Sequence, residues 1–214
     1  MNKDTEFHNL HEKFTEEAYN SKYHLLPDRY VLVLTNLCNL KCDFCFQDKK
    51  FQKNSMTPQN WINLLEQLPD YSRVTMTGGE PLVFKGFKEV FSYAIKRFPC
   101  NIITNGLLLT EEKIDYFLSF QNFRVLSISI DDIGDKLRGI SQKDWSNLEK
   151  KMIYFNKQKR EINSKCNLDV KTMILDENAE NLFDIHKYFI EKIGINTHSF
   201  QFLKGSPIQH SDKM

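Results

Sequence analysis

Short apolar runs of strand length recur along the chain, and each is bounded by polar or turn-forming residues. Continuous apolar runs of this length indicate strands that are buried on both faces. Between successive runs the apolar residues instead recur at i, i+3, i+4 and i+7, which predicts helices with one buried face. The expected strands are residues 30–35, 73–77, 100–104, 124–130, 168–175 and 196–202.

The predicted helices carry recognisable start signals. Thr57 before Pro58 predicts an N-cap followed by proline at the first helical position, and Thr110 predicts another N-cap. Ser141, three residues before Asp144, resembles a capping box. The helical side chains expected to face the core include those of Trp61, Leu64, Leu65, Leu68, Phe87, Val90, Phe91, Ile114, Phe117, Trp145, Leu148, Leu182, Ile185 and Phe189.

This alternation of strands and helices predicts an α/β fold of repeated βαβ units, with a parallel sheet and the helices outside. Eight units would close a TIM barrel, so the pattern predicts an open, partial (β/α)6 TIM-type barrel. We expect residues 1–29 to form an N-terminal helical extension, 30–203 the core, and 204–214 a tail too short for a sixth helix. We therefore expect a chain truncated before a C-terminal domain. The apolar residues of the extension that we expect to pack against the barrel are Phe7, Leu10 and Phe14.

The composition and charge of the chain exclude several classes of function. The 214 residues include 29 Lys and Arg against 28 Asp and Glu, so charge gives no reason to expect a nucleic-acid or membrane partner. No run approaches the about 18 apolar residues of a membrane span, and the polar start is unlike a secretory signal. We therefore expect a cytoplasmic protein, whose 5 cysteines are ligands or reactive groups and not disulfides.

Three cysteines, Cys38, Cys42 and Cys45, follow the first predicted strand at its carboxyl end, where α/β folds build their sites. Structural zinc sites need four ligands, whereas three thiolates suit a [4Fe–4S] cluster with one open iron. An incomplete zinc knuckle and free buried cysteines remain alternatives. The nearest candidates for a fourth ligand are His24, Cys100 and Cys166. Cys100 and Cys166 fall at the amino ends of strands, which favours packing roles.

A second motif, Gly78-Gly79-Glu80-Pro81, falls at the carboxyl end of the second strand, on the same edge as the cysteines. Glycines allow the backbone to approach a ligand closely. The backbone groups of this turn, with the Glu80 carboxylate nearby, could hold an ammonium group.

These motifs together resemble the signature of radical S-adenosylmethionine (radical SAM) enzymes, with the aromatic Phe44 before the last cysteine. Thr104-Asn105-Gly106 after the third strand also resembles the family. Ser129-Ile130-Asp131 with Arg138 is similar to the peptide-modifying branch that carries a SPASM or twitch extension. The resemblance covers roughly residues 28–203. No cysteine follows Cys166, so this chain lacks the auxiliary clusters of that branch.

The resemblance implies a set of roles. The three cysteines would hold a [4Fe–4S] cluster, and SAM would chelate its open iron. Reductive cleavage of SAM would yield a 5′-deoxyadenosyl radical that abstracts a substrate hydrogen, with the electron supplied by a donor such as flavodoxin or ferredoxin. The implied SAM contacts are Gly78, Gly79 and Glu80 to the amino group, Ser129 to the ribose, Arg138 to the carboxylate, and Phe44 with the backbone near Leu203 to the adenine. Asn105 and Asp131 are candidate contacts or turn residues, and no residue is assigned to the hydrogen abstraction.

Three functional hypotheses remain. A radical SAM enzyme acting on a peptide or protein is favoured by the motif after the fourth strand. A small-molecule enzyme of the deazaguanine-synthase type, or a glycyl-radical activating enzyme, keeps the chemistry and changes the substrate. A non-catalytic, metal-stabilised binding module would not need Gly78 to Pro81. The pattern leaves several residues open. Lys171 points either into the barrel or outward, and His186 and His198 are expected to be surface or packing residues. Lys49, Lys50 and Lys53 are expected to form a charged loop.

Overall fold

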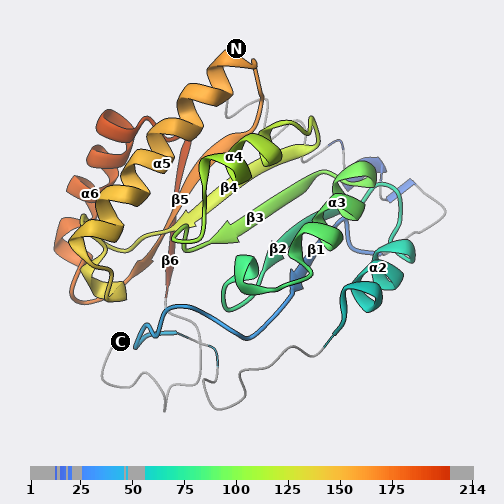
Figure 1. The fold of residues 1–214 in the computed structure, drawn as a ribbon, viewed down its shortest axis with the longest axis horizontal. Coiled ribbons are helices and arrows are strands. Elements are labelled where there is room, and N and C mark those ends of the chain that lie inside the picture. The colour runs from blue at the N-terminus through green and yellow to red at the C-terminus, as the bar shows by residue number, and fades with distance from the viewer. Residues whose placement is uncertain are drawn as a thin grey trace.

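A six-stranded, wholly parallel sheet forms the centre of the molecule, with strands in the order β1-β2-β3-β4-β5-β6 (Figure 1). The computed structural model describes residues 26–45, 47 and 56–202, with residues 13, 15–17, 19 and 20 near the N-terminus. Sequential parallel strands confirm the βαβ pattern, and β1 and β6 are the two edges of an unclosed sheet. The strands are β1 (Arg29–Val33), β2 (Arg73–Thr77), β3 (Cys100–Thr104), β4 (Phe123–Ser129), β5 (Asn167–Ile174) and β6 (Thr197–Phe202).

The connecting helices cover the face of the sheet turned toward the viewer in Figure 1, with α2 and α6 toward its two ends. The helices are α2 (Pro58–Glu66), α3 (Phe87–Arg97), α4 (Glu111–Leu118), α5 (Gln142–Glu161) and α6 (Leu182–Tyr188), which continues as a π-helical turn (Phe189–Ile193). Short 3₁₀ turns occur at Pro81–Val83, Lys136–Arg138 and Ala179–Asn181. The chain crosses over through each helix to the next strand, so all strands end at the same edge of the sheet.

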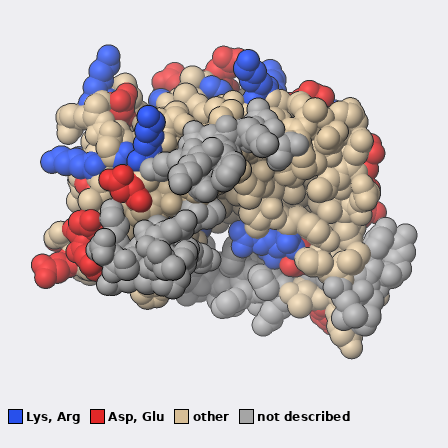
Figure 2. Space-filling view, turned by 90° about the horizontal axis from the view of Figure 1, so that it is seen from below, with Lys and Arg blue, Asp and Glu red and all other residues tan. Residues whose placement is uncertain are grey.

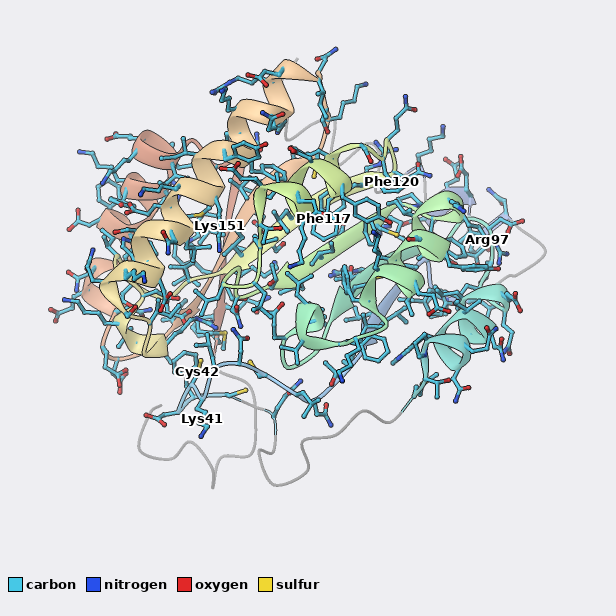
Figure 3. All side chains as sticks on the ribbon, in the orientation of Figure 1. Lys41, Cys42, Arg97, Phe117, Phe120 and Lys151 are labelled. Atoms are coloured by element: carbon cyan, nitrogen blue, oxygen red, sulfur yellow. The ribbon has the colours of Figure 1, made fainter. Side chains whose placement is uncertain are left out.

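The predicted caps start three of these helices. The hydroxyls of Thr57, Thr110 and Ser141 each accept a backbone N–H from the first turn, which satisfies a donor that the helix leaves free. Between the helices and the sheet lies a cluster of aromatic rings, with neighbouring centroids 5.1–6.0 Å apart. It consists of Phe87, Phe91, Phe117, Phe120 and Phe123. Figure 3 shows Phe117 and Phe120 in this layer and Cys42 at the opposite edge of the molecule.

Five of the six strands begin and end within one residue of their predicted bounds, and β1 ends two residues earlier than predicted. Two of the side chains predicted to face the core, Leu64 and Leu182, are only partly buried. Each lies at the margin of its helix's apolar stripe, and Ile62 is buried beside the Leu64 position instead. Phe7, Leu10 and Phe14, and residues 203–214, fall outside the described residues. None of the helices within the described segments is long and apolar enough to span a membrane.

Candidate active site

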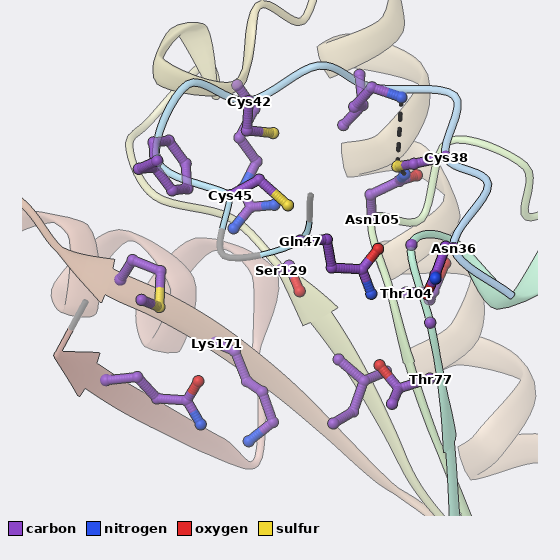
Figure 4. Close-up of a pocket in the computed structure, with 18 residues that line it drawn as sticks. Asn36, Cys38, Cys42, Cys45, Gln47, Thr77, Thr104, Asn105, Ser129 and Lys171 are labelled. Carbon is purple, nitrogen blue, oxygen red and sulfur yellow. Dashed lines mark hydrogen bonds between the residues drawn. The ribbon is translucent and has the colours of Figure 1, made fainter. Parts of the chain in front are cut away.

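A pocket of about 250 Å³ opens at the carboxyl edge of the sheet (Figure 4). Every strand contributes to it, directly or through the loop that follows. Its described lining consists of Asn36, Cys38, Leu40, Cys42, Phe44, Cys45, Gln47, Thr77, Gly78, Gly79, Ile103, Thr104, Asn105, Ser129, Arg138, Lys171, Met173 and Gln201. The face that carries this edge shows charged side chains of both signs interspersed (Figure 2).

Three half-buried cysteines, Cys38, Cys42 and Cys45, stand around the mouth of the pocket on the loop after β1. The Cys38 sulfur accepts the Leu40 N–H at 3.4 Å. Burial raises the pKa of the Cys38 and Cys42 thiols, and the Arg138 guanidinium opposes that rise. Within the described segments, no three His, Cys, Asp or Glu side chains are placed so that they could hold a single metal ion. Three thiol donors that share one cavity suit an iron–sulfur cluster with an open iron.

The other two cysteines cannot complete this set. Cys100 opens β3 and Cys166 precedes β5, so both lie at the amino ends of strands, as the sequence predicted. Both are buried, and burial raises each thiol pKa to about 12. They are packing residues in the core.

The backbone of the Gly78–Glu80 turn after β2 packs directly against the cysteine loop. The Gly79 N–H donates to the Thr35 carbonyl at 2.7 Å, and the Glu80 N–H to the Leu37 carbonyl at 2.9 Å. A Cβ on Gly78 would lie 2.5 Å from the Thr35 oxygen, and one on Gly79 would lie 2.4 Å from the Leu37 oxygen. The glycines are therefore needed for contact between two loops of the protein, in addition to the ligand approach that the sequence suggested.

Glu80 is fully buried behind this turn and does not line the pocket in the described residues. One carboxylate oxygen accepts the Leu82 N–H at 3.0 Å and the Thr104 hydroxyl at 2.7 Å, and the other accepts the Asn105 N–H at 2.8 Å. Burial raises the Glu80 pKa, while these hydrogen bonds oppose the rise. The carboxylate thus joins the end of β2 to the end of β3.

Asn105 lines the pocket beside Cys38 and also makes the turn contact considered from the sequence, while its contact with a ligand stays a prediction. Its Oδ1 accepts the Leu107 N–H at 3.0 Å. Its Nδ2 donates to Asn39 Oδ1 at 2.8 Å and lies 3.9 Å from Cys38 Sγ. Phe44 and Ser129 line the pocket as well, from the cysteine loop and the end of β4.

Arg138 reaches the pocket from the 3₁₀ turn after β4, with its guanidinium 5.4 Å from the centre of the Phe44 ring. Its Nε lies 2.6 Å from an Asp131 oxygen and 3.7 Å from an Asp135 oxygen. Asp131 also accepts the Met173 N–H at 2.7 Å and is fully buried outside the pocket lining. The solvated turn considered for Asp131 is therefore not observed, because its carboxylate is buried against Arg138. Its contact with a ligand stays a prediction.

Burial also raises the pKa of the Asp135 carboxyl to about 8, against the attraction of Arg138. Asp135 was not among the site residues predicted from the sequence. Its left-handed backbone conformation, with φ of 46°, brings it back under Asp131, whose N–H it accepts at 3.0 Å. No local pattern in the sequence predicts the left-handed turn that brings Asp135 close to Asp131.

Lys171 points into the pocket, which decides between its two predicted orientations (Figure 4). Its ammonium lies 3.3 Å from an Asp169 oxygen. The other Asp169 oxygen accepts the hydroxyls of Thr197 and Ser199, at 2.7 and 3.0 Å. Asp169 was also missed from the sequence, although residues i and i+2 of a strand share a face, and this could have paired it with Lys171.

His186 and His198 pack together between α6 and β6, with their Nδ1 atoms 3.3 Å apart, as packing residues do. Burial, with the charge of His186, lowers the His198 pKa to about 4. Leu203, Lys49, Lys50 and Lys53 fall outside the described residues.

The family model of the radical SAM superfamily matches residues 32–189, which include the end of β1, the cysteine loop and the strands β2 to β5. The chain belongs to the radical SAM superfamily. The family uses a [4Fe–4S] cluster and S-adenosylmethionine. This membership confirms the resemblance from the motifs and the partial-barrel fold class.

The chain is similar to several characterised proteins. It is 33% identical over 146 residues to the sporulation killing factor maturation protein SkfB of Bacillus subtilis (strain 168), covering 62% of this chain and 35% of SkfB. It is 31% identical over 105 residues to an S-adenosylmethionine-dependent nucleotide dehydratase of Thermoplasmatales archaeon (strain ISO4-H5), covering 47% of this chain and 37% of that protein.

Among solved structures, Streptococcus suis SuiB bound to the precursor peptide SuiA aligns with a TM-score of 0.70 and 18% identity, covering 90% of this chain and 43% of SuiB. This likeness shows a shared fold. The chain spans less than half the length of each of these three proteins.

Proposed function

We propose that this chain is the SAM-binding core of a radical SAM enzyme that modifies a peptide. The observation that carries the proposal is the convergence of three cysteine side chains on one pocket, next to a Gly-Gly-Glu turn that is bonded to the same loop. In this proposal, residues 30–203 are the catalytic core. Similarity to SkfB, a maturation protein, supports a peptide substrate.

The three thiolates of Cys38, Cys42 and Cys45 would hold the cluster. The cluster and SAM together supply reductive cleavage of SAM to methionine and a 5′-deoxyadenosyl radical, which abstracts hydrogen from the substrate. Flavodoxin or ferredoxin is the class of donor that would deliver the electron. The apolar groups of the pocket exclude water from this chemistry.

Several other lining residues would bind and orient SAM. The backbone of Gly78 and Gly79 faces the pocket, and the buried Glu80 carboxylate directly behind them adds the negative charge that attracts an amino group. On the opposite wall, Ser129 would contact the ribose and Arg138 the carboxylate. Because Asp131 and Phe44 fix the guanidinium from two sides, its donors are positioned before SAM arrives.

The charge of the pocket favours a peptide over a nucleotide substrate. Within the described lining, the positively charged side chains are Arg138 and Lys171, and each lies beside a carboxylate. A nucleotide brings several negative charges that need uncompensated cations, whereas a neutral peptide segment does not. The second candidate is a nucleotide dehydratase, which is favoured by the 31% identity over 105 residues.

The test of the core function is anaerobic reconstitution of the full chain with iron and sulfide. We expect about four irons per chain and a broad visible absorption, and dithionite reduction should then produce 5′-deoxyadenosine from SAM. Cys42→Ala should lose the cluster and the cleavage. Cys166→Ala is the matched control, because that thiol lies buried at the far end of the sheet, and it should keep both. Zinc uptake without iron uptake would refute the proposal.

Substrate class is tested by stimulation of 5′-deoxyadenosine release. Nucleoside triphosphates, added one at a time, should leave the rate of the reconstituted protein unchanged. Stimulation by one of them, with conversion of that nucleotide, would replace the peptide proposal by the dehydratase.

A further inference from the structure

The side-chain amide of Asn105 lies against the sulfur of Cys38, in a position that the SAM contacts do not explain. We propose that Asn105 is a positioning residue that donates an N–H to Cys38 Sγ and thereby raises the reduction potential of the cluster, and that Glu80 holds it in place. The inference rests on the proposed function, since it needs the cluster at Cys38, Cys42 and Cys45.

The orientation of the Asn105 amide follows from its neighbours. The Leu107 N–H donates to one end of the amide at 3.0 Å, so that end must be the oxygen. The NH₂ group is then turned toward the cysteine loop. Its two protons face two acceptors, Asn39 Oδ1 at 2.8 Å and Cys38 Sγ at 3.9 Å.

The backbone of Asn105 is held equally firmly. Its N–H donates to the buried Glu80 carboxylate at 2.8 Å, and the hydroxyl of the preceding Thr104 donates to the same carboxylate at 2.7 Å. Asn105 itself is 5% exposed and Glu80 is 0% exposed. Charge-assisted bonds in such a place are stronger than neutral ones. The Glu80 carboxylate therefore fixes the backbone from which the Asn105 amide reaches the sulfur.

The direction of the effect follows from electrostatics. Reduction adds one electron, and part of the added negative charge lies on the thiolate sulfurs. Hydrogen bonds to those sulfurs are one of the levers that set the potential of an iron–sulfur cluster. Cys38 Sγ already accepts the Leu40 N–H at 3.4 Å, so Asn105 adds a second donor to the same sulfur. Two donors at one sulfur stabilise the reduced state relative to the oxidised state.

The alternative is that Asn105 merely ties two loops together through Asn39. Two variants separate these roles. Asn39→Ala breaks the bond between the two asparagines and leaves the contact of Asn105 with Cys38. Asn105→Asp keeps the oxygen that accepts the Leu107 N–H but removes the N–H donors and places a carboxylate beside the sulfur.

The experiment is a redox titration of the reconstituted full chain, followed by the EPR signal of the reduced cluster. For Asn105→Asp we expect a tenfold or larger shift toward the oxidised state, which is a fall of about 59 mV for a one-electron couple. Asn105→Leu, which removes the donor without adding charge, should shift the same equilibrium severalfold in the same direction. The Asn39→Ala equilibrium should stay within twofold of wild type.

Equal shifts in Asn39→Ala and Asn105→Leu would overturn the proposal, and so would an unchanged potential in both Asn105 variants. Loss of iron from both Asn105 variants, with normal iron in Asn39→Ala, would also overturn it, because Asn105 would then be needed to assemble the loop. Failure of the proposed function is seen separately, as a wild-type protein that binds iron in a cluster but releases no 5′-deoxyadenosine from SAM.

Discussion

The two walls of the pocket are held by different kinds of interaction. On the wall formed by β1 to β3, backbone groups of the cysteine loop bond directly to the Gly78–Glu80 turn, and Glu80 continues the connection to Asn105. On the wall formed by β4 to β6, ion pairs dominate, with Arg138 against Asp131 and Lys171 against Asp169. Backbone segments that are already in van der Waals contact leave no room for a larger side chain, whereas the residues of a side-chain ion pair can be substituted without moving the backbone. In the proposed function, the first wall is thus suited to hold the cluster, and the second supplies Ser129 and Arg138, which would bind SAM.

The largest expected loss of stability comes from a substitution on the first wall. Gly79→Ala would bring a Cβ to 2.4 Å from the Leu37 carbonyl oxygen and 2.8 Å from that of Asn36. Both are backbone atoms that cannot rotate away, so we expect the free energy of unfolding to fall by about 3 kcal/mol, the upper range for overpacking. Urea denaturation measures this loss, and iron uptake should fall with it.

The matched control is Gly139→Ala on the second wall. A Cβ there meets nothing within 4 Å, and only its positive φ of 73° opposes the substitution. The expected cost is about 1 kcal/mol. Equal losses in the two variants would remove the contrast between the walls.

The next largest loss of stability is expected from a substitution on the second wall. Lys171→Met should lower the free energy of unfolding by about 2 kcal/mol, because it leaves the Asp169 carboxylate buried without its cation. The hydroxyls of Thr197 and Ser199 still satisfy one of the Asp169 oxygens, which keeps the loss below that of a wholly unpaired charge. Urea denaturation is again the measurement.

Lys157→Met is the control for Lys171→Met, because its pair with Glu161 is 3.8 Å long and lies on the surface of α5. Its expected loss is below about 0.5 kcal/mol. If Lys171→Met cost no more than this surface variant, the pair inside the pocket would not stabilise the second wall.

The two walls also differ in how far they could be predicted from the sequence. The strands, the caps and the positions of Cys38, Gly79 and Asn105 follow from local patterns, because periodicity and strand ends place them on one edge. The partners of Arg138 and Lys171 do not follow in this way. Asp135 reaches Asp131 only through a left-handed turn, and the hydroxyls that meet Asp169 come from a strand 28 and 30 residues away. Such pairings depend on the register between strands, which hydrophobic patterns leave open.

The smallest expected effect is a change in the free energy of unfolding with pH. It depends on the protonation of Asp135, next to Arg138 on the second wall. Burial raises the pKa of the folded Asp135 carboxyl from its ordinary value of 3.8 to about 8. The folded protein therefore binds a proton that the unfolded chain has already released, so the free energy of unfolding falls as pH rises toward 8. His198, with its pKa lowered to about 4, acts in the opposite direction, but only below its ordinary value of 6.5.

A measurement between pH 7 and 8 thus separates Asp135 from His198. Over that interval we expect wild type to lose about 1 kcal/mol in urea denaturation. Asp135→Asn keeps an oxygen that can accept the Asp131 N–H but cannot titrate, so its loss should be clearly smaller. The charged neighbours of Asp135 are the same in both proteins, namely Arg138, Asp131 and Asp132. Their contributions to the pH dependence therefore cancel when the two proteins are compared. Identical slopes would mean that Asp135 is already ionised at neutral pH, and that Arg138 balances two charged carboxylates.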